Sequence, residues 1–154
     1  MRTAGSILIL SAGAILAAAF GSAATACEGS PGPDRLILEV ENVRSDQGLM
    51  TASLYPGDPS QFLVKNGALK VWSVPAHAPE TRMCIFLPGE GNYAVAIYQD
   101  ENSNHRWDHK IFGHFEPFGF SDNPRILFSQ PSYDSVKFVA HHGETTIRIR
   151  LEHR

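Results

Sequence analysis

The sequence predicts an all-β fold, an antiparallel β-sandwich of about seven strands with one long loop between the last strands. Short segments in which apolar and polar residues alternate recur along the chain, and this is the period of a strand with one buried face. Turn-forming clusters rich in Gly, Pro, Asn and Asp separate these segments, and no long segment has the apolar period of a helix.

Four strands are predicted in the first half of the folded part, at residues 35–40, 49–55, 69–74 and 81–87. The turn at 45–48 is short, so the first two strands are expected to form a hairpin. Between the second and third strands, residues 60–67 are predicted as one helical turn, with Ser60 as its N-cap and Gly67 as its stop.

The second half contains a strong turn at 88–92 and three more predicted strands, at 93–99, 136–140 and 146–151. In the last strand Ile147 and Ile149 alternate with arginines, so one face is predicted to be buried and the other solvated. The intervening segment 100–134 is too long for an ordinary hairpin loop. We therefore expect it to be functional or to carry structure of its own.

The N-terminus has the three parts of a secretory signal peptide. Arg2 supplies a positive charge, residues 7–20 are apolar or small, and Ala24-Thr25-Ala26 has the small-x-small form of a cleavage site. The sequence therefore predicts a leader at 1–26 and a single domain at 27–154. The product is expected to be periplasmic or secreted, with no membrane span in the mature chain.

Cys27 and Cys84 are the only cysteines in the chain. In an exported protein such a pair favours a disulfide, which would join the mature N-terminus to the strand at 81–87. The alternative is a lipoprotein with a lipidated Cys27, although Ala24 stands where a lipobox prefers a large aliphatic residue. The sequence leaves both open and favours the disulfide.

The charge balance argues against one class of partner. Removing Arg2 from the 13 basic residues of the full chain leaves 12 against 16 acidic ones, a formal charge of about −4. The Lys and Arg residues form no run, and no basic patch is evident. Nucleic acid is therefore not an expected partner.

The polar segment YQDENSNHRWD follows an apolar strand and places oxygen-bearing side chains at every second position. Counted from Asp100 as position 1, the residues at positions 3, 5, 7 and 9 are Asn102, Asn104, Arg106 and Asp108. Oxygen ligands at these positions, with a backbone carbonyl at position 7, are what a calcium loop needs. One interpretation of this segment is therefore a weak calcium site, with a dissociation constant of roughly 10⁻⁴–10⁻³ M. No other cofactor is expected.

Two positions depart from a full calcium loop. Position 6, where Gly is usual because the turn is sharp, is His105, and position 12, which normally supplies a bidentate Glu, is Ile111. A complete site would need another acid, for which the candidates are Glu101, Glu116 and Asp122. The alternative, which the sequence favours, is an Asx-rich turn whose side chains accept backbone N–H bonds.

The long segment also holds five of the nine phenylalanines, namely Phe112, Phe115, Phe118, Phe120 and Phe128. An aromatic loop over a sandwich can stack on sugars or hold an apolar ligand. The alternative is a small satellite core that fixes the loop to the sheet, and the fold-back suggested by Pro117 and Gly119 favours it.

Several motifs together resemble one family of exported bacterial proteins, domain-of-unknown-function family 2141. The motifs are Asp-x-Asn-x-Asn-x-x-x-Asp after YAVAIYQ, then FG, GFSDNP and PSYDSVKF, and the resemblance covers roughly residues 35–151. This chain departs from the family pattern at His105, which replaces a loop Gly, and at Asp122, which replaces an Asn. The resemblance implies a transthyretin-like β-sandwich and implies no established activity.

Common catalytic motifs are absent from the sequence, including the Gly-x-Ser-x-Gly elbow, a Gly-rich phosphate loop and His-Glu-x-x-His. We therefore expect a non-catalytic binding or interaction module of the cell envelope, acting on an unidentified ligand or protein. The alternative is a glycan-acting hydrolase with a carboxylate pair drawn from Asp100, Glu101, Asp108 and Glu116.

Overall fold

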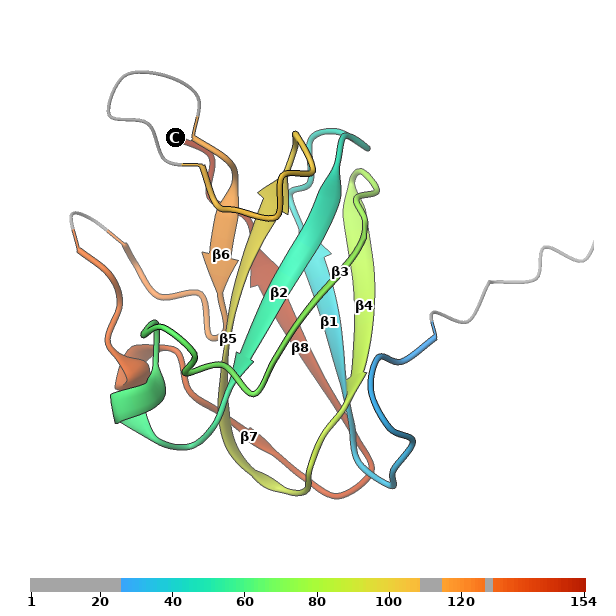
Figure 1. The fold of residues 1–154 in the computed structure, drawn as a ribbon, viewed down its shortest axis with the longest axis vertical. Helices are drawn as coiled ribbons and strands as arrows, with labels where there is room; N and C mark the ends of the chain where they lie inside the picture. The colour runs from blue at the N-terminus through green and yellow to red at the C-terminus, as the bar shows by residue number, and fades with distance from the viewer. Residues whose placement is uncertain (1–25, 109–114, 127–128) are drawn as a thin grey trace, which may run out of the picture.

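The fold is an all-β sandwich of two stacked sheets, as predicted (Figure 1). The computed structural model describes residues 26–108, 115–126 and 129–154, so Ile111, Phe112, Phe128 and almost all of the predicted leader lie outside the described residues. The strands are β1 (Arg35–Glu41), β2 (Leu49–Tyr55), β3 (Lys70–Pro75), β4 (Glu80–Phe86), β5 (Gly91–Asp100), β6 (Phe118–Phe120), β7 (Phe138–Ala140) and β8 (Glu144–Arg150).

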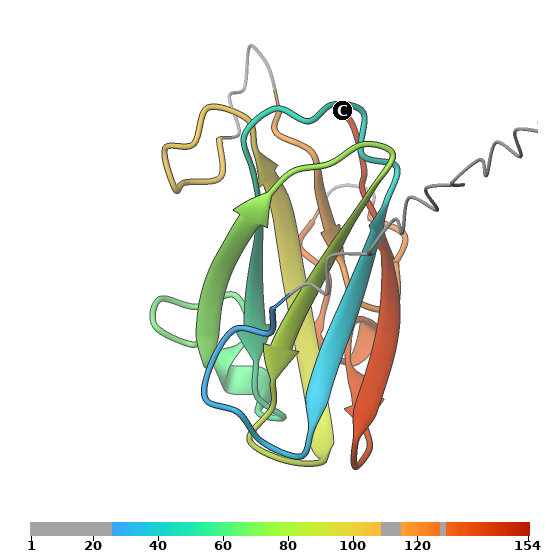
Figure 2. The same ribbon diagram turned by 90° about the vertical axis from the view of Figure 1, so that its right-hand side faces the viewer.

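The smaller sheet has the order β4-β1-β8, and the larger sheet has the order β3-β2-β5-β6, with β7 paired to the start of β5. Figure 2 shows the two sheets face to face, with β2, β3 and β5 on one side and β1, β4 and β8 on the other. All paired strands run antiparallel except β1 and β8, which are parallel. This parallel pair departs from the purely antiparallel prediction, because local alternation does not encode strand direction.

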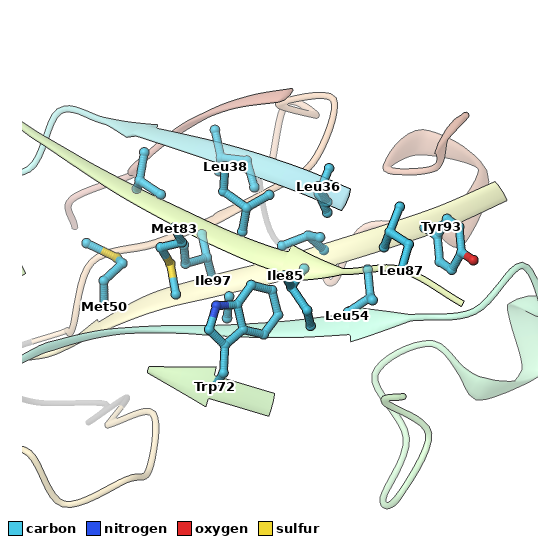
Figure 3. Packing of buried hydrophobic residues seen from close by; sticks show 14 of the residues in the cluster. Leu36, Leu38, Met50, Leu54, Trp72, Met83, Ile85, Leu87, Tyr93 and Ile97 are labelled. Atoms are coloured by element: carbon cyan, nitrogen blue, oxygen red, sulfur yellow. The ribbon is translucent and has the colours of Figure 1, made fainter. Parts of the chain in front are cut away.

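The core fills the space between the sheets. Figure 3 shows Leu36, Leu38, Met83 and Ile85 of the smaller sheet pointing into the same space as Leu54 and Trp72 of the larger one. Most of these side chains are fully buried, and burying one of this size contributes about 1.5–3 kcal/mol. The alternation that predicted the strands is therefore the alternation that builds the core.

A disulfide joins Cys27 to Cys84, with a Cα–Cα distance of 4.4 Å. Beside it, Glu28 forms a parallel bridge with Ile85, and its N–H donates to the Cys84 carbonyl at 2.9 Å. The N-terminal segment thus covers part of the free edge of β4. The pairing of Cys27 with Cys84 agrees with the interpretation that the sequence favours.

Two short helical turns differ from the prediction or were missing from it. The turn η1 (Pro59–Gln61) is capped by Asp58, whose carboxylate accepts the Ser60 N–H at 2.9 Å, so Ser60 is not the N-cap that the sequence suggested. The turn η2 (Tyr133–Ser135) lies at the end of the segment predicted as a long loop. No helix in the described residues is long and apolar enough to cross a bilayer.

The strand β6 also lies inside the segment 100–134, which therefore carries structure of its own, as predicted. It pairs antiparallel with β5, with Phe120 opposite Ala96 and Phe118 opposite Tyr98. Its Phe118 also bridges to Glu152, beyond the end of β8. The segment is therefore fixed to the edge of the larger sheet and to the end of the smaller one.

Candidate functional site

A groove lies on the outer face of the larger sheet, the face that points away from the core. There Ser53 of β2 is paired with Ala96 of β5, and Ala96 is paired with Phe120 of β6. Ser53 and Ala96 have small side chains, so the sheet surface is low at this point and forms the floor of the groove. The groove has a volume of about 480 Å³, which is in the range of small-molecule sites.

One wall of the groove is aromatic. Trp107 lies edge-to-face with Phe118 at a centroid distance of 5.4 Å, and Phe118 lies edge-to-face with Phe120 at 6.1 Å. The Arg154 guanidinium lies 5.5 Å from the Phe118 ring centroid and donates to the Ile126 carbonyl at 2.8 Å. Aromatic pairs of this kind contribute about 0.5–1.5 kcal/mol each, so these contacts favour one arrangement of the wall.

A second wall comes from the segment after η1, which contributes Leu63, Val64 and Lys65. The residue before them, Phe62, is buried and lies edge-to-face with Phe120 at a centroid distance of 6.3 Å. This contact belongs to a small second core outside the main one. Of the described phenylalanines of the long segment, Phe120 thus packs against a satellite core, and Phe118 and Phe120 border the groove.

A further hollow, of about 670 Å³, has as its described lining residues Asp122, Pro124, Arg125, Ile126, Ser129, Gln130, Pro131, Ser132 and Ser135. None of its lining residues belongs to a strand, so paired backbone does not hold its shape. The groove on the sheet has a floor of hydrogen-bonded strands. We therefore take the groove, despite its smaller volume, as the candidate site.

The Asp/Asn segment next to the groove closes on itself through hydrogen bonds. Asp100 is fully buried and accepts the Asn104 N–H at 3.0 Å through Oδ1 and the His105 N–H at 2.7 Å through Oδ2. His105 has a φ of 60°, in the left-handed region where a calcium loop normally has Gly. The sharp turn predicted at this position is therefore present without the Gly.

The other predicted ligands lie in the same turn. The Nδ2 atoms of Asn102 and Asn104 both donate to Oδ2 of Asp108 at 2.8 Å. Asn102 Oδ1 accepts the Asn104 N–H at 3.0 Å, and Asn104 Oδ1 accepts the Arg106 N–H at 2.8 Å. These are the Asx-turn contacts of the alternative that the sequence favoured.

Glu116 is the candidate acid that reaches this turn. It is buried, and its two oxygens accept the N–H groups of Glu101 at 3.1 Å and Asp108 at 2.8 Å. Burial raises the pKa of Glu116, and the negative charges of Asp100 and Asp108 raise it further, although the two N–H donors lower it. Of the other candidates, Glu101 contributes its backbone N–H here and Asp122 lies after β6.

Neither the turn nor the rest of the described chain gathers three or more His, Cys, Asp or Glu side chains in an arrangement that could hold a metal ion. The turn instead combines two amides with its carboxylates. Amide oxygens are ordinary Ca²⁺ ligands, so the predicted calcium set remains a prediction.

Two residues connect the groove to the Asp/Asn turn. Trp107 lines the groove, and its Nε1 donates to the Glu116 carbonyl at 3.3 Å. Tyr98 also lines the groove, and burial raises the pKa of Tyr98, with further contributions from the charges of Asp100, Glu116 and Asp108. A change in the conformation of the Asp/Asn turn would therefore also change the position of the aromatic wall.

The groove itself was not predicted from the sequence. The sequence pointed to the segment 100–134, and Trp107, Phe118 and Phe120 of that segment do line the groove. The floor, however, comes from Ser53 and Ala96, which are 43 residues apart in the chain and meet only through strand pairing. The available signal was a small residue at an outward position in each of two strands.

A family model described as "Uncharacterized protein conserved in bacteria (DUF2141)" matches residues 38–148. The match includes the Asp/Asn turn, the floor of the groove and its aromatic wall up to Phe120. The comparisons with curated proteins and with solved structures find no match. The family resemblance seen in the sequence motifs is confirmed.

Proposed function

The chain belongs to DUF2141, a family of uncharacterized proteins conserved in bacteria, and from this premise we propose that it is an exported, non-catalytic binding module of the cell envelope. In this proposal residues 1–26 are the leader, and residues 27–154 form one domain in the periplasm or outside the cell. The disulfide supports this location, because disulfides persist in oxidising compartments.

Intact mass spectrometry of the protein recovered after expression with its leader tests the location. We expect the mass of residues 27–154 less two hydrogens, from cleavage after Ala26 and formation of the disulfide. Recovery of the full-length chain only, in the cytoplasmic fraction, would contradict export.

The observation that carries the binding role is the groove. Its floor lies on paired strands and its aromatic wall is held by ring contacts, as is typical of preformed sites for small molecules. Among the described residues that line it, none is Asp, Glu, His or Cys. The carboxylate, imidazole and thiol groups that most enzymes use for acid–base and nucleophilic chemistry are thus missing from that lining, which favours binding over chemistry.

The neutral apolar dye N-phenyl-1-naphthylamine, whose fluorescence rises when it leaves water, tests the groove. We expect saturable binding to the oxidised mature protein and its loss in Ala96→Trp, because the indole would fill the floor. Val139→Trp places the same ring at an exposed position of β7 and should bind the dye as the wild type does. Unchanged binding by a folded Ala96→Trp variant would overturn this assignment.

Calcium binding by the Asp/Asn turn is a second candidate, and one observation favours it. Asp108 Oδ2 lies 2.8 Å from an amide nitrogen of both Asn102 and Asn104, so these three side chains already meet at one point. Rotating each amide by about half a turn would direct its oxygen there instead. A cation would also offset the negative charges that raise the pKa of Glu116.

Thermal unfolding with and without Ca²⁺ tests this candidate. For a dissociation constant of ~1 mM, about 10 mM Ca²⁺ adds about 1.4 kcal/mol to the free energy of unfolding and should raise Tm by about 4–7 °C. Asp108→Asn should lose the shift, while Glu152→Gln, which removes an exposed acid outside the turn, should keep it. The absence of a shift in the wild type at millimolar Ca²⁺ would remove the proposal.

The glycan-acting hydrolase remains the alternative, and the contacts of its carboxylates weigh against it. Such an enzyme needs two carboxyl groups that face the substrate. Asp100 and Glu116 are buried, and each uses both oxygens to accept backbone N–H groups. Neither lines the groove, so their contacts support a structural role.

A further inference from the structure

We propose that the groove binds a small amphiphile with an aliphatic body and one carboxylate, a medium- or long-chain fatty acid in chemical class. This inference rests on the proposed binding function and names the ligand class of the same groove. It is carried by the shape of the floor and by the charges at the walls.

The floor suits an elongated apolar body. Ser53 and Ala96 are small, and their row continues across the sheet to Phe120 on one side and Val71 on the other. Val71 is 54% exposed, so apolar surface extends beyond the groove along the same row. A flexible chain can follow this line and cover Val71, whereas a compact ligand would leave it in water.

The charges at the walls suit an anion. The charged side chains among the described lining residues are Lys65 and Arg154, both cations. Within the described part of the chain, neither of them forms an ion pair with a carboxylate. This local positive charge stands out in a chain with a formal net charge of −3.

Two acids whose charges act on the groove residue Tyr98 are buried and already hydrogen-bonded. Asp100 and Glu116 are 0% and 2% exposed, and their oxygens accept backbone N–H groups. Arg154 is held in place by its contacts with Phe118 and the Ile126 carbonyl. A carboxylate that reached Lys65 or Arg154 would therefore gain a charge partner without displacing an existing one.

Competition against N-phenyl-1-naphthylamine with three ligands that carry a ten-carbon chain, each below its micelle concentration or, for decanol, its solubility limit, tests the proposal. These are decanoate, decanol and decyltrimethylammonium, which share a chain length and differ in charge. We expect decanoate to displace the dye about two- to fivefold more tightly than decanol, the ratio that one partly exposed charge pair supplies, and the cation to be the weakest.

Charge reversal locates the effect. The double variant with Lys65→Glu and Arg154→Glu should lose the preference for decanoate over decanol, measured by isothermal titration calorimetry of each ligand. Arg82→Glu, at an exposed position of β4 on the opposite sheet, should keep the preference. Far-ultraviolet circular dichroism and Tm of each variant show whether it is folded.

The possible outcomes distinguish a failure of the fatty-acid inference from a failure of the proposed binding function. If the dye binds in the groove but decanol competes as well as decanoate, or a neutral oligosaccharide displaces the dye at lower concentration, the fatty-acid inference fails and the binding module stands. If a folded charge-reversed variant keeps the decanoate preference, the inference also fails. If the dye does not bind saturably at all, both proposals fail.

Discussion

The two faces of the larger sheet are built by the same strands and have opposite character. On the inner face Met50 and Leu54 of β2 are 0% and 1% exposed, and they pack against the other sheet. On the outer face Ser53, between them in the chain, is half-buried, and its neighbour Val71 is 54% exposed. Leu54 is therefore assigned to the core and Ser53 to the groove floor, so a mutation at Leu54 can change stability while it spares the floor.

The largest expected contrast is between adjacent residues of β2. Leu54→Ala should lower the free energy of unfolding by about 2–5 kcal/mol, because it leaves a cavity between the sheets. Ser53→Ala, one residue earlier on the outer face, removes only a hydrogen bond with Tyr55 and should lower it by about 0.5–1.5 kcal/mol. Urea unfolding of the oxidised protein measures both, and similar losses in the two variants would contradict the division between faces.

Removing the disulfide should lower stability without changing the groove. Cys27 and Cys84 are 57 residues apart, and closing a loop of that length stabilises the fold by about 4 kcal/mol in the chain-entropy model. The paired variant Cys27→Ser with Cys84→Ser should therefore unfold at lower urea concentration. The folded variant should still bind N-phenyl-1-naphthylamine with unchanged affinity. A large loss of affinity would show that the disulfide supports the shape of the groove.

Gly119 shows how closely β6 approaches the other sheet. A Cβ at this position would lie 2.7 Å from Ile149 Cγ2 and 3.0 Å from the Arg150 carbonyl oxygen. Gly119→Ala should therefore cost about 1–3 kcal/mol through overpacking on the inner face. Gly89→Ala, whose Cβ would meet nothing within 4 Å, is the matched control and should leave urea unfolding almost unchanged. Equal behaviour of the two variants would mean that β6 is not held against β8.

The smallest expected effect is a pH dependence at Glu116. Its raised pKa means that the folded protein binds a proton there more readily than the unfolded chain, whose value is near 4.5. The contribution of this group to stability should therefore rise as pH falls from above the folded pKa to about 4.5.

Urea unfolding of the wild type and Glu116→Gln between pH 4.5 and 7.5 measures this effect. The stability of the wild type relative to the variant should increase toward low pH, because Gln at this position does not titrate. A difference that stays constant, or that shrinks toward low pH, would contradict the assigned direction.

The sequence predicted the parts of the fold that depend on local alternation. Strands β1 and β2 lie close to their predicted ranges, and their apolar residues form the core. Strand β6 was missed because Phe118-Gly119-Phe120 is too short to show a period, and its pairing partner is distant in the chain. The parallel pairing of β1 and β8 was missed because strand direction depends on the path of the whole chain.

The candidate site likewise has a part that local sequence predicts and a part that depends on distant residues. The turn at Asp100 could be read from its spacing, since its hydrogen bonds join residues within a few positions of one another. The groove could not, because Ser53 and Ala96 carry no signal until β2 and β5 are placed side by side. Local chemistry is visible in a sequence, whereas a surface shaped by distant small residues requires the fold.

The pairing of β1 with β8 has a consequence for when the fold is complete. Arg35 and Glu144, 109 positions apart, are held side by side by a hydrogen bond of 2.9 Å. A chain that emerges from its N-terminus exposes one edge of β1 until its last strand arrives, and an open edge invites pairing with other chains. Truncation before β8 should therefore yield aggregates rather than a smaller domain, because the smaller sheet cannot form fully until β8 pairs with β1.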